Sequence, residues 1–219
     1  MTRPKLIVFA SGSKTGGGSG FENLVVSVNN GILDAEIMAV VSNHANGGVR
    51  QRANKLQIPF YHMTKPFTAE AYQDIVKKFS AKWIALSGWL KLVCGLPPEH
   101  TFNIHPGPLP EFGGQGMYGH HVHEAVLKAF LAGQFPYSAI TMHFVDEAYD
   151  RGPTFFQKRV PIYQGDTADT LAERVNETEH AWQPYITDLI VNGHIRYENG
   201  KVIVPGWYTW FSCHLELAV

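Results

Sequence analysis

The sequence predicts an α/β domain with an open, mainly parallel twisted sheet and helices on both of its faces. Short apolar runs rich in Val and Ile recur along the chain, as expected for strands that a parallel sheet buries on both sides. Segments with apolar residues three and four positions apart separate these runs, so strand and helix signals alternate. The 219 residues, 45% of them hydrophobic, suffice for one domain with a sizeable core. We expect that domain to span residues 1–205 and to be followed by a C-terminal tail at 206–219.

Seven segments have the composition of strands. They are residues 5–10, 36–42, 58–61, 83–86, 101–105, 138–144 and 154–161. Proline cannot donate a hydrogen bond to a sheet, so Pro59 places the third of these strands towards an edge. Only a short loop separates the last two segments, so we expect the seventh strand to pair antiparallel with the sixth.

Five segments have helical spacing. They begin near residues 21, 49, 68, 120 and 166 and end near residues 28, 56, 79, 132 and 192. Asp166 or Thr167 can cap the last helix, and Pro184 is expected to kink or break it because proline lacks the N–H that the helix needs. Asn199-Gly200 lies between two short strand-like runs and predicts a small C-terminal hairpin.

The composition excludes several classes of protein. The formal net charge is −1, so no basic surface indicates a nucleic-acid partner. Cys94 and Cys213 do not make a disulfide framework, which favours a reduced, cytoplasmic compartment. No apolar run approaches the length of a membrane span or a signal-peptide core, so we expect no membrane partner. The oligomeric state remains open.

The loop after the first strand predicts an anion site. Residues 11–20 are almost entirely Gly and Ser and lie between a buried strand and a helix start. Backbone N–H groups and the helix dipole favour a phosphate at such a place. Val8 and Ser13 occupy positions where a Walker A loop needs glycine, so this is a different kind of cradle, and a flexible surface loop is the alternative. The candidate phosphate ligands are Ser11, Gly12, Ser13 and Lys14.

The strongest candidate for chemistry is the strand end at residues 101–105. Asn103 and His105 are two positions apart, so their side chains share one face of the strand. Pro106 favours an extended backbone at His105, and the loop that follows lies where open parallel sheets bind ligands. A capping Asn and a surface His are the alternative explanation.

Asp150 lies in the loop between the last two predicted strands of the sheet. It is either a turn residue or a carboxylate aimed at the histidine. A tract of His120, His121 and His123 opens a helix and invites a metal-site interpretation. Zinc sites on helices favour histidines four positions apart, and these are adjacent or two apart, so a structural or substrate role is favoured over a metal.

These residues together resemble the folate-dependent formyltransferases, over roughly residues 5–204. The resemblance is carried by Asn103-Ile104-His105-Pro106, Leu109-Pro110, the strand ending in His143-Phe144-Val145, Asp150 before Gly152-Pro153, and Thr178-Glu179-His180. Within this family, the single-domain length and the Ser-Gly loop favour the enzymes that formylate glycinamide ribonucleotide. Residues 14–18 and 115–118 look longer than the family pattern.

The resemblance implies a Rossmann-like formyltransferase fold and transfer of a formyl group from 10-formyltetrahydrofolate to the amine of glycinamide ribonucleotide in purine synthesis. It implies small-molecule substrates, with folate as a co-substrate, no permanently bound cofactor and no metal. The implied catalytic residues are Asn103, His105 and Asp150, and Glu179 is implied to hold the ribose hydroxyls. The implied folate-binding residues are Trp89, Leu90, Lys91, Leu92, Val93, Val145 and Asp146.

The chemistry of formyl transfer assigns a role to each catalytic candidate. Asn103 and protonated His105 would donate hydrogen bonds to the oxyanion, and Asp150 would raise the pKa of His105 and relay protons. One alternative is a formyltransferase for another phosphorylated or sugar amine. Two further alternatives are a metal-dependent hydrolase built on the histidines with Asp150, and a non-catalytic phosphosugar-binding module.

Overall fold

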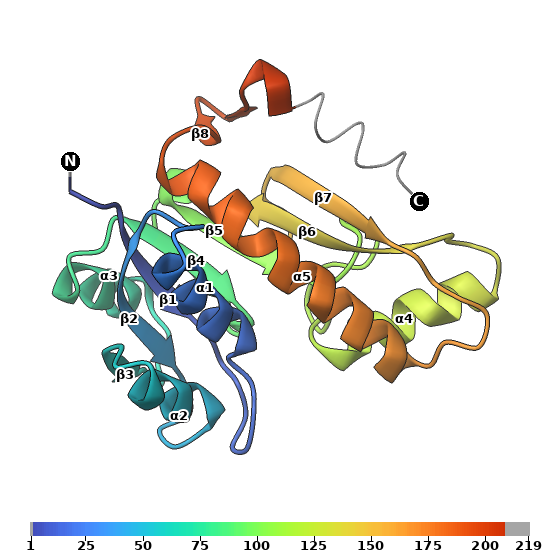
Figure 1. The fold of residues 1–219 in the computed structure, drawn as a ribbon, viewed down its shortest axis with the longest axis horizontal. Coiled ribbons are helices and arrows are strands. Elements are labelled where there is room, and N and C mark those ends of the chain that lie inside the picture. The colour runs from blue at the N-terminus through green and yellow to red at the C-terminus, as the bar shows by residue number, and fades with distance from the viewer. Residues whose placement is uncertain (1, 209–219) are drawn as a thin grey trace.

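A seven-stranded sheet forms the centre of the molecule (Figure 1). The computed structural model describes residues 2–208. The strands are β1 (Lys5–Phe9), β2 (Glu36–Ser42), β3 (Phe60–His62), β4 (Trp83–Ser87), β5 (Thr101–His105), β6 (Ser138–Phe144) and β7 (Thr154–Val160), in the spatial order β3-β2-β1-β4-β5-β6-β7. Strands β1 to β5 run parallel, and β6 is antiparallel to both of its neighbours. The mainly parallel sheet with an antiparallel strand is confirmed.

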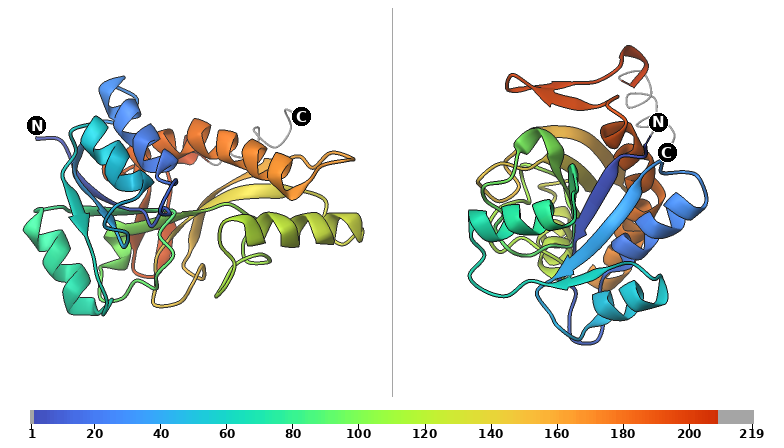
Figure 2. Two further views of the ribbon diagram at one scale, coloured as in Figure 1. Left: turned by 90° about the horizontal axis from the view of Figure 1, so that it is seen from below. Right: turned by 90° about the vertical axis from the view of Figure 1, so that its left-hand side faces the viewer.

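Helices cover both faces of this sheet. They are α1 (Ser19–Asn29), α2 (Gly48–Lys55), α3 (Ala69–Lys78), α4 (His120–Leu131) and α5 (Ala168–Val191), with a 3₁₀ turn at Pro98–His100. Helices α1, α2 and α5 lie on one side of β1 and β2, and α3 lies on the other (Figure 2). Successive residues of a strand point to opposite faces, so Leu6 and Val8 of β1 pack in one core cluster while Ile7 and Phe9 pack in the other. The four side chains are fully buried, as the apolar sequence predicts.

The third strand differs from its predicted bounds of 58–61. The N–H of Ile58 closes the end of α2 by donating to the carbonyl of Ala53, and Pro59 contributes only its carbonyl, to Val40. Regular pairing therefore starts at Phe60. The strand lies at the edge of the sheet, as the proline predicts.

Helix α5 runs without interruption through Pro184, so of the predicted kink or break, the break does not occur. Proline cannot donate to the carbonyl four residues earlier, that of His180. The side chain of Asn23 in α1 supplies the missing donor, with 2.8 Å between its Nδ2 and the carbonyl oxygen of His180. The predicted cap is confirmed at Thr167, whose side chain accepts from the N–H of Thr170.

We expect Asn23→Leu to lower the free energy of unfolding by about 1–3 kcal/mol, the usual cost of leaving a buried polar group unpaired. Urea denaturation measures this change. The matched control is the same substitution in a Pro184→Ala background. There the N–H of residue 184 can donate to the carbonyl of His180, so Asn23→Leu should lower the free energy of unfolding by less. An equal loss in both backgrounds would show that the hydrogen bond from Asn23 contributes nothing.

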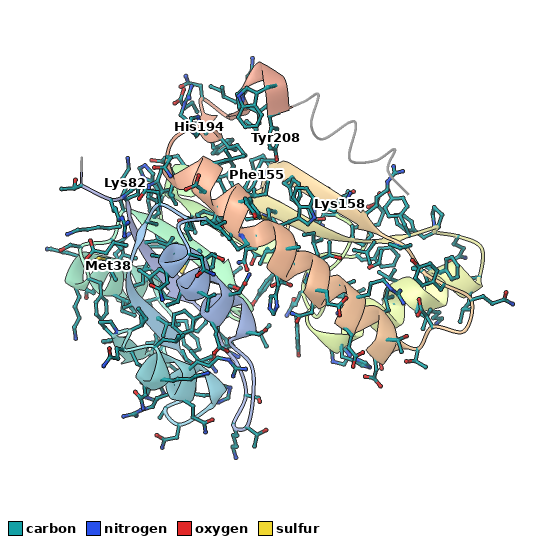
Figure 3. All side chains as sticks on the ribbon, in the orientation of Figure 1. Met38, Lys82, Phe155, Lys158, His194 and Tyr208 are labelled. Atoms are coloured by element: carbon teal, nitrogen blue, oxygen red, sulfur yellow. The ribbon has the colours of Figure 1, made fainter. Side chains whose placement is uncertain are left out.

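The chain beyond α5 adds the predicted hairpin, β8 (Arg196–Glu198) and β9 (Lys201–Ile203). Tyr208, in the predicted tail, is buried, and its hydroxyl donates to the carbonyl of Phe155 at 2.9 Å (Figure 3). The rest of that tail lies outside the described residues. Within residues 2–208, no helix has the length and apolar character needed to cross a membrane.

Candidate active site

A cavity of about 640 Å³ opens where β1, β4 and β5 end. Its wall comprises residues 12–13, 17–20, 87–90, 103–106, 114–119 and 149–150, with further side chains from α4 and α5. The carboxyl ends of parallel strands meet at one edge of an open sheet, which is where such folds bind ligands. The cavity therefore lies where the sequence predicts a site.

Asn103, His105 and Asp150 meet at this cavity. Asp150 Oδ1 lies 3.4 Å from Asn103 Nδ2, and Asp150 Oδ2 lies 3.6 Å from His105 Nδ1. The N–H of Gly114 donates to Asp150 Oδ2 at 3.1 Å. Asp150 has a positive φ of 54°, an uncommon conformation for a residue with a side chain. The structure thus brings the three predicted catalytic residues together.

His143 in β6 belongs to the same cluster, although sequence reasoning did not select it. The antiparallel register places it opposite Asn103. Its Nδ1 lies 2.8 Å from the carbonyl oxygen of Phe144, so Nδ1 carries the proton and Nε2 accepts from Asn103 Nδ2 at 3.1 Å. Alternation along the strand predicts that His143 and Thr141 point to the same face of the sheet. Only the pairing of β5 with β6 shows that His143 lies opposite Asn103.

The charge state of His105 differs from the prediction. Burial lowers the pKa of His105 below its usual value, and this effect outweighs the upward influence of Asp150 and of the hydrogen bond to Phe112. His105 Nε2 donates to the carbonyl oxygen of Phe112 at 2.8 Å, while the 3.6 Å to Asp150 is too long for a hydrogen bond. Asp150 raises the pKa of His105 as predicted, but burial outweighs this effect, so the protonated imidazole that was predicted is not favoured.

Asp150 is held in its ionised form. Burial alone would raise the pKa of this carboxyl. Interactions with His143, His105 and the Gly114 N–H outweigh burial and leave the pKa below its usual value. The cluster therefore pairs a carboxylate with a buried imidazole that favours its neutral form.

The glycine-rich loop reaches the cavity with fewer of the predicted ligands than expected. Gly12 and Ser13 line it, whereas Lys14 is exposed and does not. Ser11 is buried, and its Oγ accepts from the N–H of Leu90 at 2.9 Å, so it joins two loops. Residues 17–20, at the other end of the loop, also line the cavity.

The start of α1 forms part of the cavity wall. The capping residue is Gly18, in a left-handed conformation, and no side chain caps the helix. The first N–H groups of a helix have no partner within the helix, and together with the dipole they favour an anion. Sequence reasoning located this loop but selected its first residues rather than its last.

The predicted folate segment is only partly at the cavity. Trp89 and Leu90 line it, while Lys91, Leu92, Val93, Val145 and Asp146 are not in its wall. Trp89 belongs mainly to the core, since its indole N–H donates to the Tyr72 hydroxyl at 3.0 Å. A second cavity of about 420 Å³ shares Gly114, Tyr149 and Asp150 with the first.

Glu179 of α5 lines the large cavity. Burial raises the pKa of its carboxyl to about 7. Within residues 2–208, no hydrogen bond or ion pair to this carboxyl accompanies that burial. Among the described residues, this partly buried carboxyl lines the cavity without a protein partner, so a ligand or water can donate to it.

The histidine tract has two different environments. His120 and His121 are exposed and lie 3.5–3.7 Å from acidic side chains. His123 is buried at the cavity, and burial lowers its pKa to about 4. Among the described residues, no three His, Cys, Asp or Glu side chains converge as a metal site would require.

Comparisons with known proteins agree with this geometry. The family model described as formyl transferase matches residues 4–187. A chloroplastic phosphoribosylglycinamide formyltransferase from Vigna unguiculata is 37% identical over 81% of this chain, which spans only 58% of that protein. The phosphoribosylglycinamide formyltransferase of Bacillus subtilis is 31% identical over 83% of this chain and 92% of its own length.

Solved structures show the same similarity. The phosphoribosylglycinamide formyltransferase of Coxiella burnetii superimposes with a TM-score of 0.79 at 26% identity, covering 94% of this chain and 95% of that one. Glycinamide ribonucleotide transformylase 1 of Symbiobacterium toebii gives a TM-score of 0.78 at 25% identity, with coverages of 92% and 94%.

Proposed function

The chain belongs to the formyl transferase family, and on that premise we propose that it formylates glycinamide ribonucleotide, with 10-formyltetrahydrofolate as the donor, in purine synthesis. The observation that carries this proposal is the convergence of Asn103, His105 and Asp150 beside an uncapped helix N-terminus in one cavity. Formyl transfer to a phosphorylated amine needs both a proton-transfer centre and an anion site. The identity of the substrate is inferred from the names of the related enzymes, which are phosphoribosylglycinamide formyltransferases.

The phosphate of the substrate binds at Gly12 and residues 17–20, where the uncapped start of α1 lines the cavity and its first N–H groups can receive an anion. The ribose lies against α5, and its hydroxyl groups donate to the unpaired carboxyl of Glu179. These two contacts direct the amine towards Asp150. 10-Formyltetrahydrofolate enters along Trp89 and Leu90. It gives up its formyl group once per turnover.

The reaction proceeds by direct attack. The amine nitrogen bonds to the formyl carbon, and negative charge develops on the formyl oxygen, which accepts from Asn103 Nδ2. That amide N–H lies 3.4 Å from Asp150, a long hydrogen bond that is easily exchanged for one to substrate. Asp150, already ionised, accepts the proton of the amine through a water molecule. Collapse breaks the bond from the formyl carbon to the folate nitrogen, which gains a proton.

His105 acts in this scheme as the proton partner of Asp150. Asp150 can pass the proton that it accepts from the amine to His105 Nδ1, which faces it, and the imidazole can return that proton to the leaving nitrogen. The His105 Nε2–H stays on Phe112. The direct oxyanion donor is therefore Asn103, with the charge on His105 supporting it.

The test is a turnover assay with 10-formyltetrahydrofolate and a panel of amines. We expect formylated glycinamide ribonucleotide, and a large loss of kcat/KM for the amine that lacks the phosphate. Formylation of a different phosphorylated amine, with glycinamide ribonucleotide unused, would transfer the proposal to that amine. Absence of formyl transfer to every amine would overturn it.

We expect Gly12→Ala to raise the KM for glycinamide ribonucleotide by about tenfold and to leave the KM for folate unchanged. Gly12 has φ +65°, which costs a residue with a side chain about 1–2 kcal/mol, and an added Cβ would lie 2.8 Å from Val49. Steady-state kinetics with each substrate varied measures the effect. Lys14→Ala is the matched control on the same loop, and it should change neither KM because Lys14 is outside the cavity wall. Equal losses for both substrates in Gly12→Ala would contradict a dedicated phosphate cradle.

A further inference from the structure

Polar groups from two elements converge on Gly20, in the first turn of α1. A Cβ at this position would collide with the hydroxyl of Ser87 at the end of β4. It would also lie 3.2 Å from Gln183 Oε1 and 3.4 Å from Glu179 Oε1, both on α5. The absence of a side chain at Gly20 therefore lets these three polar groups approach one point at the floor of the cavity.

Gln183 is the member of this group that the proposed function leaves unexplained. Its side chain is 1% exposed, and its Oε1 has no hydrogen-bond partner in the described structure. It is not in the cavity wall, whereas Glu179 and Ser87 are. Buried amide oxygens normally have a donor, so this one requires an explanation.

Gln183 and Glu179 are four residues apart on α5, which places them side by side on one face of the helix. The helix is held in position at this turn, because Asn23 donates to the carbonyl of His180 and compensates for Pro184. Helix α5 therefore continues through this turn, and Glu179 and Gln183 keep their helical spacing.

We propose that Gln183 is a positioning residue: when the phosphorylated sugar binds, its amide forms a hydrogen bond to the carboxyl of Glu179, one not made in the described structure, and so holds that carboxyl towards the sugar hydroxyl groups. This inference rests on the proposed function. An amide has both an acceptor and donors, so Gln183 can accept from a protonated carboxyl or, after rotation of its amide, donate to an ionised one. Both states of Glu179 occur near neutral pH, since its pKa is raised to about 7.

The test is Gln183→Met, which keeps the length of the side chain and removes its amide. We expect the KM for glycinamide ribonucleotide to rise by about tenfold, the equivalent of one lost hydrogen bond to a charged group, with kcat and the folate KM unchanged. The double variant with Glu179→Gln should be no worse than Glu179→Gln alone. Losses that multiply would show that Gln183 does not act through Glu179.

Thr187→Val is the matched control. Thr187 is one turn further along α5, is fully buried, and has an Oγ1 without a partner, but it is not among the three atoms nearest to a Cβ at Gly20. Its substitution should leave the KM for glycinamide ribonucleotide unchanged. If Gln183→Met and Thr187→Val have the same KM, Gln183 is only a buried polar residue and the inference is wrong.

A second variant, Gln183→Asn, keeps the amide but withdraws it from Glu179 and should raise the same KM. If thermal unfolding shows that both Gln183 variants fail to fold while Thr187→Val folds, the role of Gln183 is structural and the inference is overturned.

Calorimetric titration of glycinamide ribonucleotide separates failure of the proposed function from failure of the positioning role of Gln183. A wild-type protein that does not bind it contradicts the proposed function, whereas equal binding by wild type and Gln183→Met contradicts only the positioning role.

Discussion

Asp150→Asn is expected to lower kcat by about 10²–10⁴-fold, the usual contribution of a positioned acid or base. The carboxylate contacts Asn103, His105, His143 and the N–H of Gly114, and it is the ionised group of the cluster. An amide of the same shape keeps most of these contacts but cannot take the proton of the amine. The KM values should change much less than kcat, because the carboxylate acts on charge that develops during the reaction.

The pH dependence of Asp150→Asn follows from His105. Burial already lowers the pKa of His105, and the charge of Asp150 opposes that effect. Without this charge the pKa of His105 falls further, so protonation of the imidazole requires lower pH. Because His105 must be neutral at Nδ1 to take up a proton, we expect the residual activity of the variant to be lost on acidification at a lower pH than the activity of the wild type.

The measurement is kcat against pH for wild type, Asp150→Asn, His105→Asn and the double variant. Two residues that work as one proton-transfer unit should be strongly non-additive. If the two losses multiply in the double variant, Asp150 and His105 act independently. The assignment of His105 as the proton partner of Asp150 would then be wrong.

Asn103→Ala is expected to lower kcat by about 10²–10³-fold, the typical effect of removing one oxyanion donor. Its amide N–H groups face His143 and Asp150, and the longer of these two hydrogen bonds, to Asp150, is the one that substrate would replace. Single-turnover kinetics with both substrates bound measures the chemical step directly. Unchanged single-turnover rates would remove Asn103 from the reaction.

His143→Ala provides the control for this assignment. His143 Nε2 accepts from Asn103 and orients its amide, so its loss should lower kcat less than the loss of Asn103 itself. In the Asn103→Ala background, removing His143 should add little. A full additional loss there would give His143 a role of its own.

Much of this molecule is predictable because its signals are local. Alternating apolar runs and helical spacing are properties of neighbouring residues, so the sheet, the helices and the cap at Thr167 follow from the sequence. The shared strand face of Asn103 and His105 is equally local, because side chains two positions apart point the same way. The break that was one of the predicted outcomes at Pro184 does not occur, because Asn23 supplies a donor to the carbonyl of His180 from 157 positions away in the sequence.

The sequence alone determined the fold class, the strand end that carries Asn103 and His105, and the glycine-rich loop, since each depends on residues within a few positions of one another. The tertiary structure alone decided which groups meet and in what charge state. It placed His143 opposite Asn103, buried His105 enough to lower its pKa, and put Gly12, Ser13 and the start of α1, rather than Ser11, in the cavity wall. Those outcomes depend on strand register, on burial and on contacts between distant segments, which local patterns do not encode.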